Sequence, residues 1–376
     1  MLVVAPTVSG YCRGILRGVY QYAAARGGWR LGRRDSATIT SPADLTGWDA
    51  LIYCQAGRSP AVADLAAPGL ALVDVSNAQD TPGFAQVTSD DLLAGRLAAE
   101  HLLACGHRNF AWAGYDGPAY GAKRRTGFLA CLRENGAAVH EHVLYQGRHE
   151  GGRWIRQGEA TTAWLRSLPK PCGLLVISDV DAVHVAAQAG DAGLGIPDDL
   201  ALIGVDDDDL ACMLTAPALS SVALDGERVG RQAAIILDRI LGGEQVIGQF
   251  LVPPSGIRAR GSTGGEPIAD PVLRLAVGWL RRNSHAHVRL AECAQAAGVA
   301  ERTLRQRCLH QLGRPPQRIL QELRIAHAER LLAGSDLPLK AVAMRCGFAS
   351  AAYLCTAFRA VRGTTPAAWR RTATRT

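Results

Sequence analysis

Two segments near the end of the chain share one pattern, and this repeat limits the fold there more than any other feature. Residues 290–312 read LAECAQAAGVAERTLRQRCLHQL, and residues 339–361 read LKAVAMRCGFASAAYLCTAFRAV. In each segment a short helical pattern ends at a glycine, and a second helical pattern follows it. Because glycine readily adopts the positive φ that ends many helices, each segment is predicted to be a helix-turn-helix unit.

The turn residues place the helices within both units. The first unit turns at Gly298 and its second helix begins near Glu301. The second unit turns at Gly347, and its second helix begins near Ser350, whose hydroxyl is a favourable N-cap. A long helix over about residues 316–332 is predicted to join the two units.

Charge is distributed unevenly along the chain. Residues 270–376 hold 18 Lys and Arg against 6 Asp and Glu, a net charge of +12, whereas the rest of the chain has a net charge of −5. A basic segment that contains helix-turn-helix patterns favours binding to double-stranded DNA, with each second helix in the major groove. The alternative is a basic surface that has no nucleic-acid partner.

The first 250 or so residues alternate between short apolar runs and amphipathic stretches. The apolar runs predict strands at 2–5, 50–53, 71–75, 109–113, 173–177 and 201–205. The amphipathic stretches predict helices at 13–26, 89–105, 124–135 and 181–192. This alternation predicts an α/β fold with mostly parallel sheets, arranged as one unit up to about residue 84 and another through about residue 220.

The predicted domains are 1–260, a linker at 261–269 and an all-helical domain at 270–376. Residues 249–260 read as extended chain, and GSTGG follows them. Asp270 and Pro271 then provide an N-cap and a proline at the first helical position. In open α/β sheets, ligands bind at the carboxyl ends of the strands, so two facing sheets predict a ligand cleft.

Several classes of protein are disfavoured by composition. The ten cysteines form no CxxC pair, so we expect neither a structural metal site nor a disulfide framework, and no cofactor. No run of eighteen apolar residues occurs, so no membrane association is expected. The first residues read as a strand and not as a signal peptide, and we therefore expect a cytoplasmic protein.

The C-terminal motifs resemble the DNA-binding domain of the AraC family. The resemblance covers about residues 270–371 and includes Gly347-Phe348, Thr365-Pro366 and Trp369-Arg370. It implies two recognition helices that enter successive major grooves. Arginine pairs with guanine and glutamine with adenine, so the first helix is expected to read bases. Its predicted DNA-binding residues are Arg302, Thr303, Arg305 and Gln306.

The second recognition helix carries smaller and less polar side chains. We expect it to contact thymine methyl groups and phosphates more than other base edges. Its predicted DNA-binding residues are Ser350, Tyr353 and Thr356, and the candidate phosphate contacts are Arg345, Arg359 and Arg362. The alternative for these three arginines is a solvated basic face.

The N-terminal motifs resemble the sugar-binding domains of the lactose/galactose repressor family. GLGIPDDLALIGVD at residues 193–206 and RRTGF at residues 124–128 carry the resemblance. It implies a two-lobed fold like that of periplasmic binding proteins, with a sugar in the cleft. Guanidinium and carboxylate groups bind paired hydroxyls, and aromatic rings cover C–H faces. The candidate sugar-binding residues are Arg124 and Asp206, then Asp179 and Asp207, with Tyr11, Trp112 and Tyr115 as aromatic platforms. The run 206–209 also admits a metal, although we favour ligand contacts and a solvated loop.

A sugar-binding domain followed by an AraC-type domain resembles the family of xylose operon regulators. That resemblance implies a regulator, expected to be an activator, that responds to D-xylose and works with RNA polymerase as a homodimer. The alternatives are the same architecture with another sugar or polyol, a transport binding protein, and an enzyme fused to a DNA-binding module. No GxSxG motif is present and no base can be assigned to Cys54, so we expect no enzyme activity.

Overall fold

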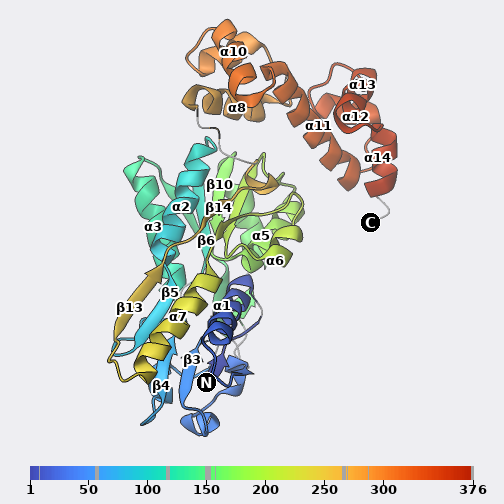
Figure 1. Cartoon of the computed structure of the whole chain (residues 1–376). Coiled ribbons are helices and arrows are strands. Elements are labelled where there is room, and N and C mark those ends of the chain that lie inside the picture. Colours follow the sequence, from blue (N-terminus) through green and yellow to red (C-terminus); the bar gives the residue numbers. More distant parts are fainter. Residues whose placement is uncertain are drawn as a thin grey trace. The chain divides into compact units, whose positions relative to one another are not determined.

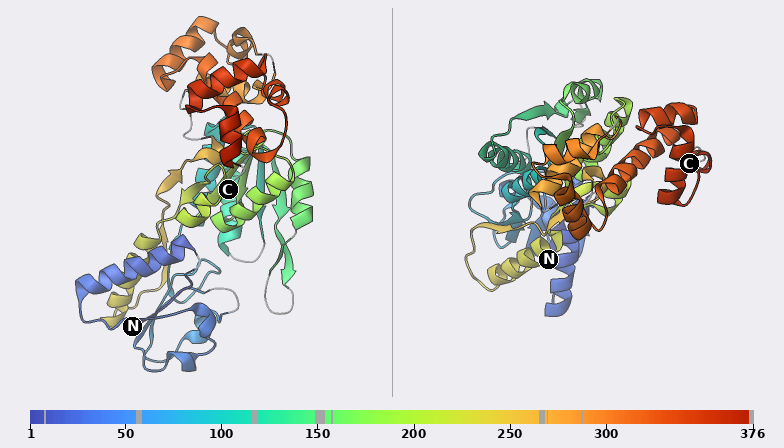
Figure 2. Two further views of the ribbon diagram at one scale, coloured as in Figure 1. Left: turned by 90° about the vertical axis from the view of Figure 1, so that its right-hand side faces the viewer. Right: turned by 90° about the horizontal axis from the view of Figure 1, so that it is seen from above.

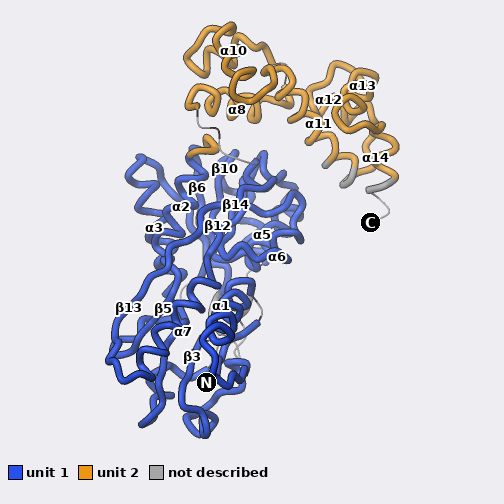
Figure 3. The backbone as a smooth tube through the Cα atoms, in the orientation of Figure 1, with its two compact units in different colours: residues 1–103, 108–266 blue, residues 104–107, 267–376 orange. Residues whose placement is uncertain are grey.

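A computed structural model describes the chain except for residues 8, 56–58, 116–118, 149–153, 157, 265–267, 269, 287 and 374–376. The chain divides into two compact units (Figure 3). Unit 1 consists of residues 1–103 and 108–266, and unit 2 of residues 104–107 and 267–376. The predicted linker at 261–269 lies partly outside the described residues, and its first residues form a buried 3₁₀ turn, η4 (Gly261–Thr263), in unit 1.

Unit 1 contains two six-stranded sheets, one in each of two lobes (Figure 1). The sheet of lobe 1 has the order β13-β5-β4-β3-β1-β2, and all of its strands are parallel. Its strands are β1 (Leu2–Val4), β2 (Gly32–Arg34), β3 (Ala50–Tyr53), β4 (Ala71–Asp74), β5 (Ala85–Ser89) and β13 (Gly248–Val252). Both faces are covered, which explains the uninterrupted apolar runs in the central strands.

The sheet of lobe 2 has the order β14-β12-β11-β10-β6-β7 and is parallel except for β14. Its strands are β6 (Asn109–Gly114), β7 (Val139–Val143), β10 (Cys172–Val176), β11 (Leu200–Val205), β12 (Ser220–Ala223) and β14 (Gly256–Arg258). A separate hairpin pairs β8 (Tyr145–Arg148) with β9 (Trp154–Arg156).

Helices connect the strands of unit 1, and four of the seven in its described part overlap the four stretches predicted as helices. The seven helices are α1 (Gly10–Arg26), α2 (Asp91–Ala104), α3 (Ala119–Glu134), α4 (Gly158–Ser167), α5 (Asp179–Asp191), α6 (Asp209–Met213) and α7 (Gly226–Leu241). Three 3₁₀ turns, η1 (Ser36–Thr38), η2 (Pro42–Leu45) and η3 (Val62–Leu65), lie along lobe 1. The predicted two-lobed α/β class is confirmed.

The lobes are not consecutive segments, which corrects the division near residues 84 and 220. After β12 the chain returns to lobe 1 as α7 and β13, and it then goes back to lobe 2 as β14. The β13 strand pairs with β5, about 160 residues earlier in the sequence. Hydrophobic periodicity predicts that a strand exists but not which sheet it joins, so this return could not be read from the pattern.

Glycines allow two pairs of helices in unit 1 to pack closely. Helices α1 and α7 lie side by side (Figures 1 and 2). A Cβ atom on Gly18 would overlap the carbonyl oxygen of Glu227, and one on Gly230 would overlap that of Ile15. The same arrangement joins α2 and α3 at Gly95 and Gly127. These positions therefore exclude any side chain, because the obstacle is backbone.

Gly18→Val is expected to destabilise unit 1 by about 3 kcal/mol, since overpacking a close helix contact forces backbone to move. Gly27→Ala serves as a control for glycine replacement, because a Cβ there meets no atom within 4 Å and only the positive φ of 72° opposes it. Urea unfolding measures both values. Equal stability of Gly18→Val and wild type would contradict the close packing.

Unit 2 is all helical in its described part. Its helices are α8 (Pro271–Asn283), α9 (Leu290–Ala296), α10 (Glu301–Leu312), α11 (Pro316–Gly334), α12 (Leu339–Arg345), α13 (Ala351–Arg362) and α14 (Pro366–Ala373). Gly298 and Gly347 have φ of 71° and 73°, as the predicted turns require. The Asp270 side chain caps α8, and Ser350 caps α13 by accepting a hydrogen bond from the Tyr353 amide. The predicted pair of helix-turn-helix units is confirmed.

Each helix-turn-helix unit has its own hydrophobic core. Leu304 and Cys308 belong to the first core, and Leu354 and Phe358 belong to the second. Helix α11 contributes to both, with Ile319 in the first core and Ala328 in the second. The long helix therefore sets the spacing between the two recognition helices, α10 and α13.

Candidate functional site

Arg124, the first sugar-binding candidate, lies at the centre of a buried polar cluster in unit 1. Its Nε donates to Asp91 Oδ1 over 2.7 Å, its Nη1 to the carbonyl oxygen of Ile177 over 2.6 Å, and its Nη2 to Asp206 Oδ1 over 3.4 Å. Its side chain is 3% exposed. Burial raises the pKa of both Asp91 and Asp206, although the Arg124 charge opposes that rise.

The turn that carries Asp206 has an unusual backbone. Asp206 and Asp207 have φ of 122° and 54°, a region that residues other than glycine rarely adopt. Their neighbours hold the turn: the Asp206 amide donates to Val222 O, and the Asp207 amide donates to Ser221 Oγ. Non-glycine residues in such conformations cluster at ligand sites, because the surrounding structure must compensate for their cost.

Asp179 lies next to this turn, at the start of α5. Its Oδ1 accepts from Ser221 Oγ over 2.7 Å, and its Oδ2 accepts from the Asp208 amide over 2.8 Å. Burial raises the pKa of Asp179 to about 6. The Asp179 carboxylate therefore holds the turn at residues 206–208 in two ways. It binds the Asp208 amide directly, and it binds Ser221, whose hydroxyl accepts from the Asp207 amide.

The raised pKa of Asp179 predicts a pH-dependent stability. Unfolding restores the ordinary value of 3.8, so the folded form holds its proton more tightly and loses relative stability as pH rises from about 4 to above 6. Asp179→Asn removes this titration. The free energy of unfolding of the variant minus that of wild type should increase by about 2 kcal/mol between pH 4 and pH 7. Urea unfolding at both pH values measures it, and a constant difference would contradict the shifted pKa.

The aromatic candidates occupy three different settings. Tyr11 is buried in α1, and its hydroxyl accepts from the Ser89 amide. The Tyr115 hydroxyl lies 2.9 Å from that of Tyr120. Trp112 is 4% exposed within β6, with its ring over Gly114, so it lies in the core of lobe 2.

Three residues of the cluster were not predicted from the sequence. Asp91 pairs with Arg124, Tyr120 stacks on the Arg124 guanidinium at 4.9 Å, and Asn77 from lobe 1 donates to Asp91 Oδ2 over 3.1 Å. The only available signal for Asp91 was its position at the start of a helix after a strand. The Asn77 contact crosses between lobes and depends on tertiary structure alone.

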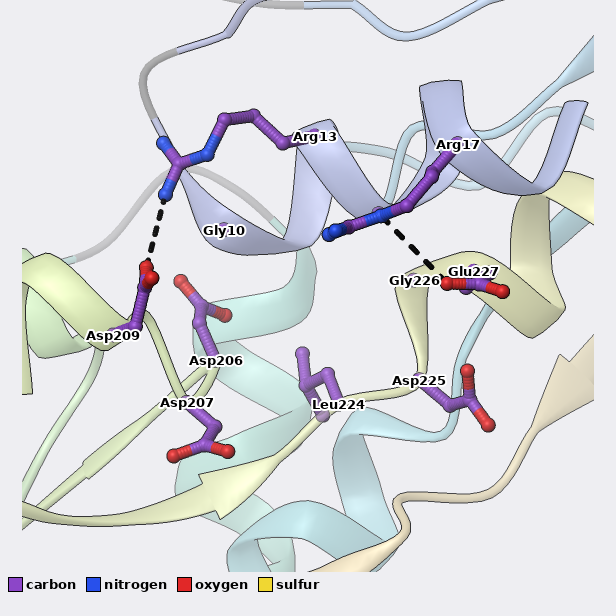
Figure 4. Close-up of a pocket in the computed structure, with 11 residues that line it drawn as sticks. Gly10, Arg13, Arg17, Asp206, Asp207, Asp209, Leu224, Asp225, Gly226 and Glu227 are labelled. Carbon is purple, nitrogen blue, oxygen red and sulfur yellow. Dashed lines mark ion pairs between the residues drawn. The ribbon is translucent and has the colours of Figure 1, made fainter. Parts of the chain in front are cut away.

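A cavity of about 390 Å³ opens beside the turn at residues 206–209, between lobe 1 and lobe 2 (Figure 4). It is lined by the first turns of α1 and α7 and by the loop after β11. Asp206 and Asp207 face it, and Arg13 and Arg17 extend along its rim toward Asp209 and Glu227. Polar walls rich in carboxylates suit a ligand with many hydroxyl groups better than an apolar one.

The run 206–209 does not gather around one point. Asp206 pairs with Arg124, Asp207 with Arg260, and Asp208 with Arg13. Among the described residues no group of three metal-ligating side chains is close enough to hold an ion. Each of these three carboxylates thus has a cationic partner of its own.

The first recognition helix, α10, presents its predicted base-reading side chains at the surface. Arg302, Arg305 and Gln306 are exposed, and Thr303 is half-buried. Arg305 Nη2 lies 2.9 Å from Glu301 Oε1, one turn earlier. This ion pair holds the guanidinium on the exposed face, and DNA would have to replace Glu301 as its partner.

The second recognition helix, α13, also exposes its candidates. Ser350 caps the helix, Tyr353 is 52% exposed beside the Phe348 ring, and the Thr356 hydroxyl donates to Ala352 O. Two of the three hydroxyl-bearing side chains are thus already hydrogen-bonded to the backbone of the helix. The weaker contribution of this helix to base reading stays a prediction.

The three phosphate candidates differ in their partners. Arg345 and Arg359 are exposed near the ends of α12 and α13. Arg362 forms two hydrogen bonds to Glu329 of α11, at 2.5 and 2.9 Å. Arg362 therefore links two helices in this structure, and contact with a phosphate would compete with that pair.

Two family models match the chain, one in each unit. Residues 99–263 match a periplasmic binding protein-like domain, and residues 293–372 match a helix-turn-helix domain. Among the described residues, no helix has the length and apolar character needed to cross a membrane.

Proteins of known function resemble the chain over most of its length. The xylose operon regulatory protein of Haemophilus influenzae is 25% identical over 294 residues, which cover 77% of this chain and 75% of that protein. The Escherichia coli K12 protein of the same name is 26% identical over 298 residues, covering 78% and 75%.

A solved structure has the same fold over almost the whole chain. The xylose-binding transcription activator XylR matches with a TM-score of 0.60 and 23% identity, covering 99% of this chain and 98% of that one. The chain is therefore a DNA-binding transcription regulator with the architecture of the xylose operon regulators, in which a periplasmic binding protein-like domain precedes a helix-turn-helix domain.

Proposed function

We propose that this regulator binds a sugar, D-xylose, between the lobes of unit 1, and that the sugar controls DNA binding by unit 2. The observation that carries the proposal is the meeting of Arg124 and Asp206 at the carboxyl ends of the lobe 2 strands. A buried guanidinium beside a carboxylate can bind vicinal hydroxyls through paired hydrogen bonds. The names of the full-length relatives support xylose as the sugar.

The ligand acts by favouring one arrangement of the lobes. Asn77 and the start of α1 contact lobe 2, so a sugar held between the lobes adds further contacts when they approach. A ligand shifts such an equilibrium only by its difference in affinity for the two states. The response to sugar is then a coupling between two sites, and DNA must change the affinity for sugar by the same factor.

The remaining parts of the proposal concern its setting. We infer a homodimeric activator that contacts RNA polymerase, acts in the cytoplasm where its DNA lies, and has no catalytic activity. DNA contacts are assigned to Arg302, Thr303, Arg305 and Gln306 in α10 and, more weakly, to the exposed face of α13.

Titration of the full chain with sugars tests the effector. We expect heat of binding with D-xylose and a change in affinity for fluorescent upstream DNA in its presence, measured at fixed salt because phosphate contacts make affinity salt-dependent. L-arabinose, D-ribose and xylitol test the alternative sugar or polyol. An unchanged DNA affinity in the presence of each of the four compounds would contradict the proposal.

A further inference from the structure

The four consecutive carboxylates after β11 contact three different parts of unit 1. Asp206 contacts Arg124 in the candidate sugar site. Asp207 Oδ1 accepts from Arg260 Nη2 over 2.6 Å. Asp208 Oδ2 accepts from the Gly10 amide at the start of α1 over 2.5 Å, and from Arg13 over 3.1 Å. One turn therefore touches the sugar site, the opposite lobe and the segment that contains Arg260.

Arg260 connects the turn to the last described segment of unit 1. Besides Asp207, its guanidinium bonds to Leu219 O over 2.8 Å, and its backbone amide donates to Ser220 Oγ over 2.8 Å. The residue directly precedes η4. One side chain and the adjoining backbone thus connect Asp207 to η4.

The η4 turn is held by buried hydroxyl groups. Ser262 Oγ donates to Leu202 O over 2.5 Å and accepts from the Ser220 amide over 2.7 Å. Thr263 Oγ1 lies 2.7 Å from Ser220 Oγ and 2.9 Å from His101 Nε2. Ser262 and Thr263 are fully buried. Burial lowers the pKa of His101 to about 4, so its ring is neutral near pH 7.

A fully buried polar network favours discrete arrangements over gradual ones. Each of these hydroxyls would lose its partner if the turn shifted part-way, and an unpaired buried polar group is costly. The Asp206–Asp207 backbone, with positive φ at both residues, is likewise held by its surroundings. Both the Asp206–Asp207 turn and η4 are thus held in place by specific partners.

We propose that Asp207, Arg260, Ser220 and Thr263 form the route that couples the sugar site to the C-terminal end of unit 1. The regulatory role of this route rests on the proposed function, whereas its geometry does not. When sugar binds Asp206, the adjacent Asp207 moves. Arg260 then takes a new position, and this changes the strength of the hydrogen bonds that hold η4. Unit 1 ends at residue 266, three residues after Thr263, and Ser262 of η4 is hydrogen-bonded to the lobe 2 strands. Asp207 and Arg260 are positioning residues in this scheme.

Amide hydrogen exchange of the full chain without sugar tests the route itself. The Ser262 amide donates to Ala218 O, and the Gly264 amide donates to Gly261 O. Asp207→Asn and Arg260→Lys should each speed exchange at these amides about tenfold or more. Arg258→Gln is the matched control, because Arg258 is 64% exposed and lies 3.7 Å from the same carboxylate. Wild-type exchange at η4 in both variants would overturn the proposal.

Binding measurements test the use of the route. Arg260→Lys should bind D-xylose within about threefold of wild type, while the sugar-dependent change in DNA affinity falls about fivefold or more, which is the scale of allosteric coupling. Arg258→Gln should retain both properties. Parallel loss of sugar affinity and DNA response in Arg260→Lys would overturn the route in favour of direct ligand contact. If sugar does not change the DNA affinity of wild type, the proposed function is wrong. The exchange experiment still tests the route in that case.

Discussion

Arg124→Met is expected to destabilise unit 1 by about 3–5 kcal/mol and to abolish sugar binding. The substitution leaves the Asp91 and Asp206 carboxylates buried without their cation, and removing one partner of a buried ion pair costs about this much. Both carboxylates already have raised pKa values because of burial, so they would bind protons when Arg124 is lost. Urea unfolding and calorimetric titration with D-xylose measure the two effects.

The neighbouring residue provides the control for Arg124. Arg125 is 46% exposed and pairs with Glu141 at the surface. Arg125→Met should cost less than about 1 kcal/mol, because exposed ion pairs contribute little. Equal effects of the two substitutions would show that the buried cluster has no special importance. Loss of stability in Arg124→Met with unchanged sugar affinity would instead assign Arg124 a purely structural role.

Removing Arg302 and Arg305 together should weaken binding to the specific DNA site by about 2–6 kcal/mol, since each bidentate arginine–guanine contact contributes about 1–3 kcal/mol. Both side chains are exposed on α10. The paired substitution Tyr353→Ala and Thr356→Ala in α13 should cost less, because the Thr356 hydroxyl is bonded within the helix. Fluorescence anisotropy with specific and scrambled duplexes measures both.

Arg307→Ala is the control within the same helix. Arg307 Nη1 pairs with Asp270 Oδ2 at 2.9 Å, so it stabilises the start of α8 instead of facing outward alone. We expect its DNA affinity to stay within about threefold of wild type. If the α10 double variant loses equal affinity for specific and scrambled DNA, Arg302 and Arg305 contact phosphates, and the assignment of base reading is wrong.

The predicted elements with the strongest local signals match the structure closely. Gly298 and Gly347 marked both helix turns, and Ser350 marked the cap of α13. The fold of unit 2 is local: each short helix packs on its sequence neighbours, so periodicity and turn chemistry carry most of the information. Strand β3 was also predicted with its observed limits, because it is a short apolar run with clear boundaries in the sequence.

The candidate site was only partly accessible to the same reasoning. Arg124 and Asp206 were found because they lie in motifs, and they are hydrogen-bonded in the structure. Asp91 and Asn77 were missed, since a buried partner of Arg124 has no distinguishing pattern of its own. Trp112 was proposed as an aromatic platform, and in the structure it is 4% exposed among the buried residues of lobe 2.

The sequence by itself determined the central strands, four helices of unit 1 and the starts of α10 and α13, because these depend on contacts between residues close in the chain. Only the tertiary structure decided that α7 and β13 return to lobe 1, that Asp207 faces Arg260, and that η4 is buried against lobe 2. Each of these contacts joins residues about 40 or more positions apart. Such contacts depend on how large surfaces pack against one another. The hydrophobic pattern of one segment does not specify which distant segment packs against it.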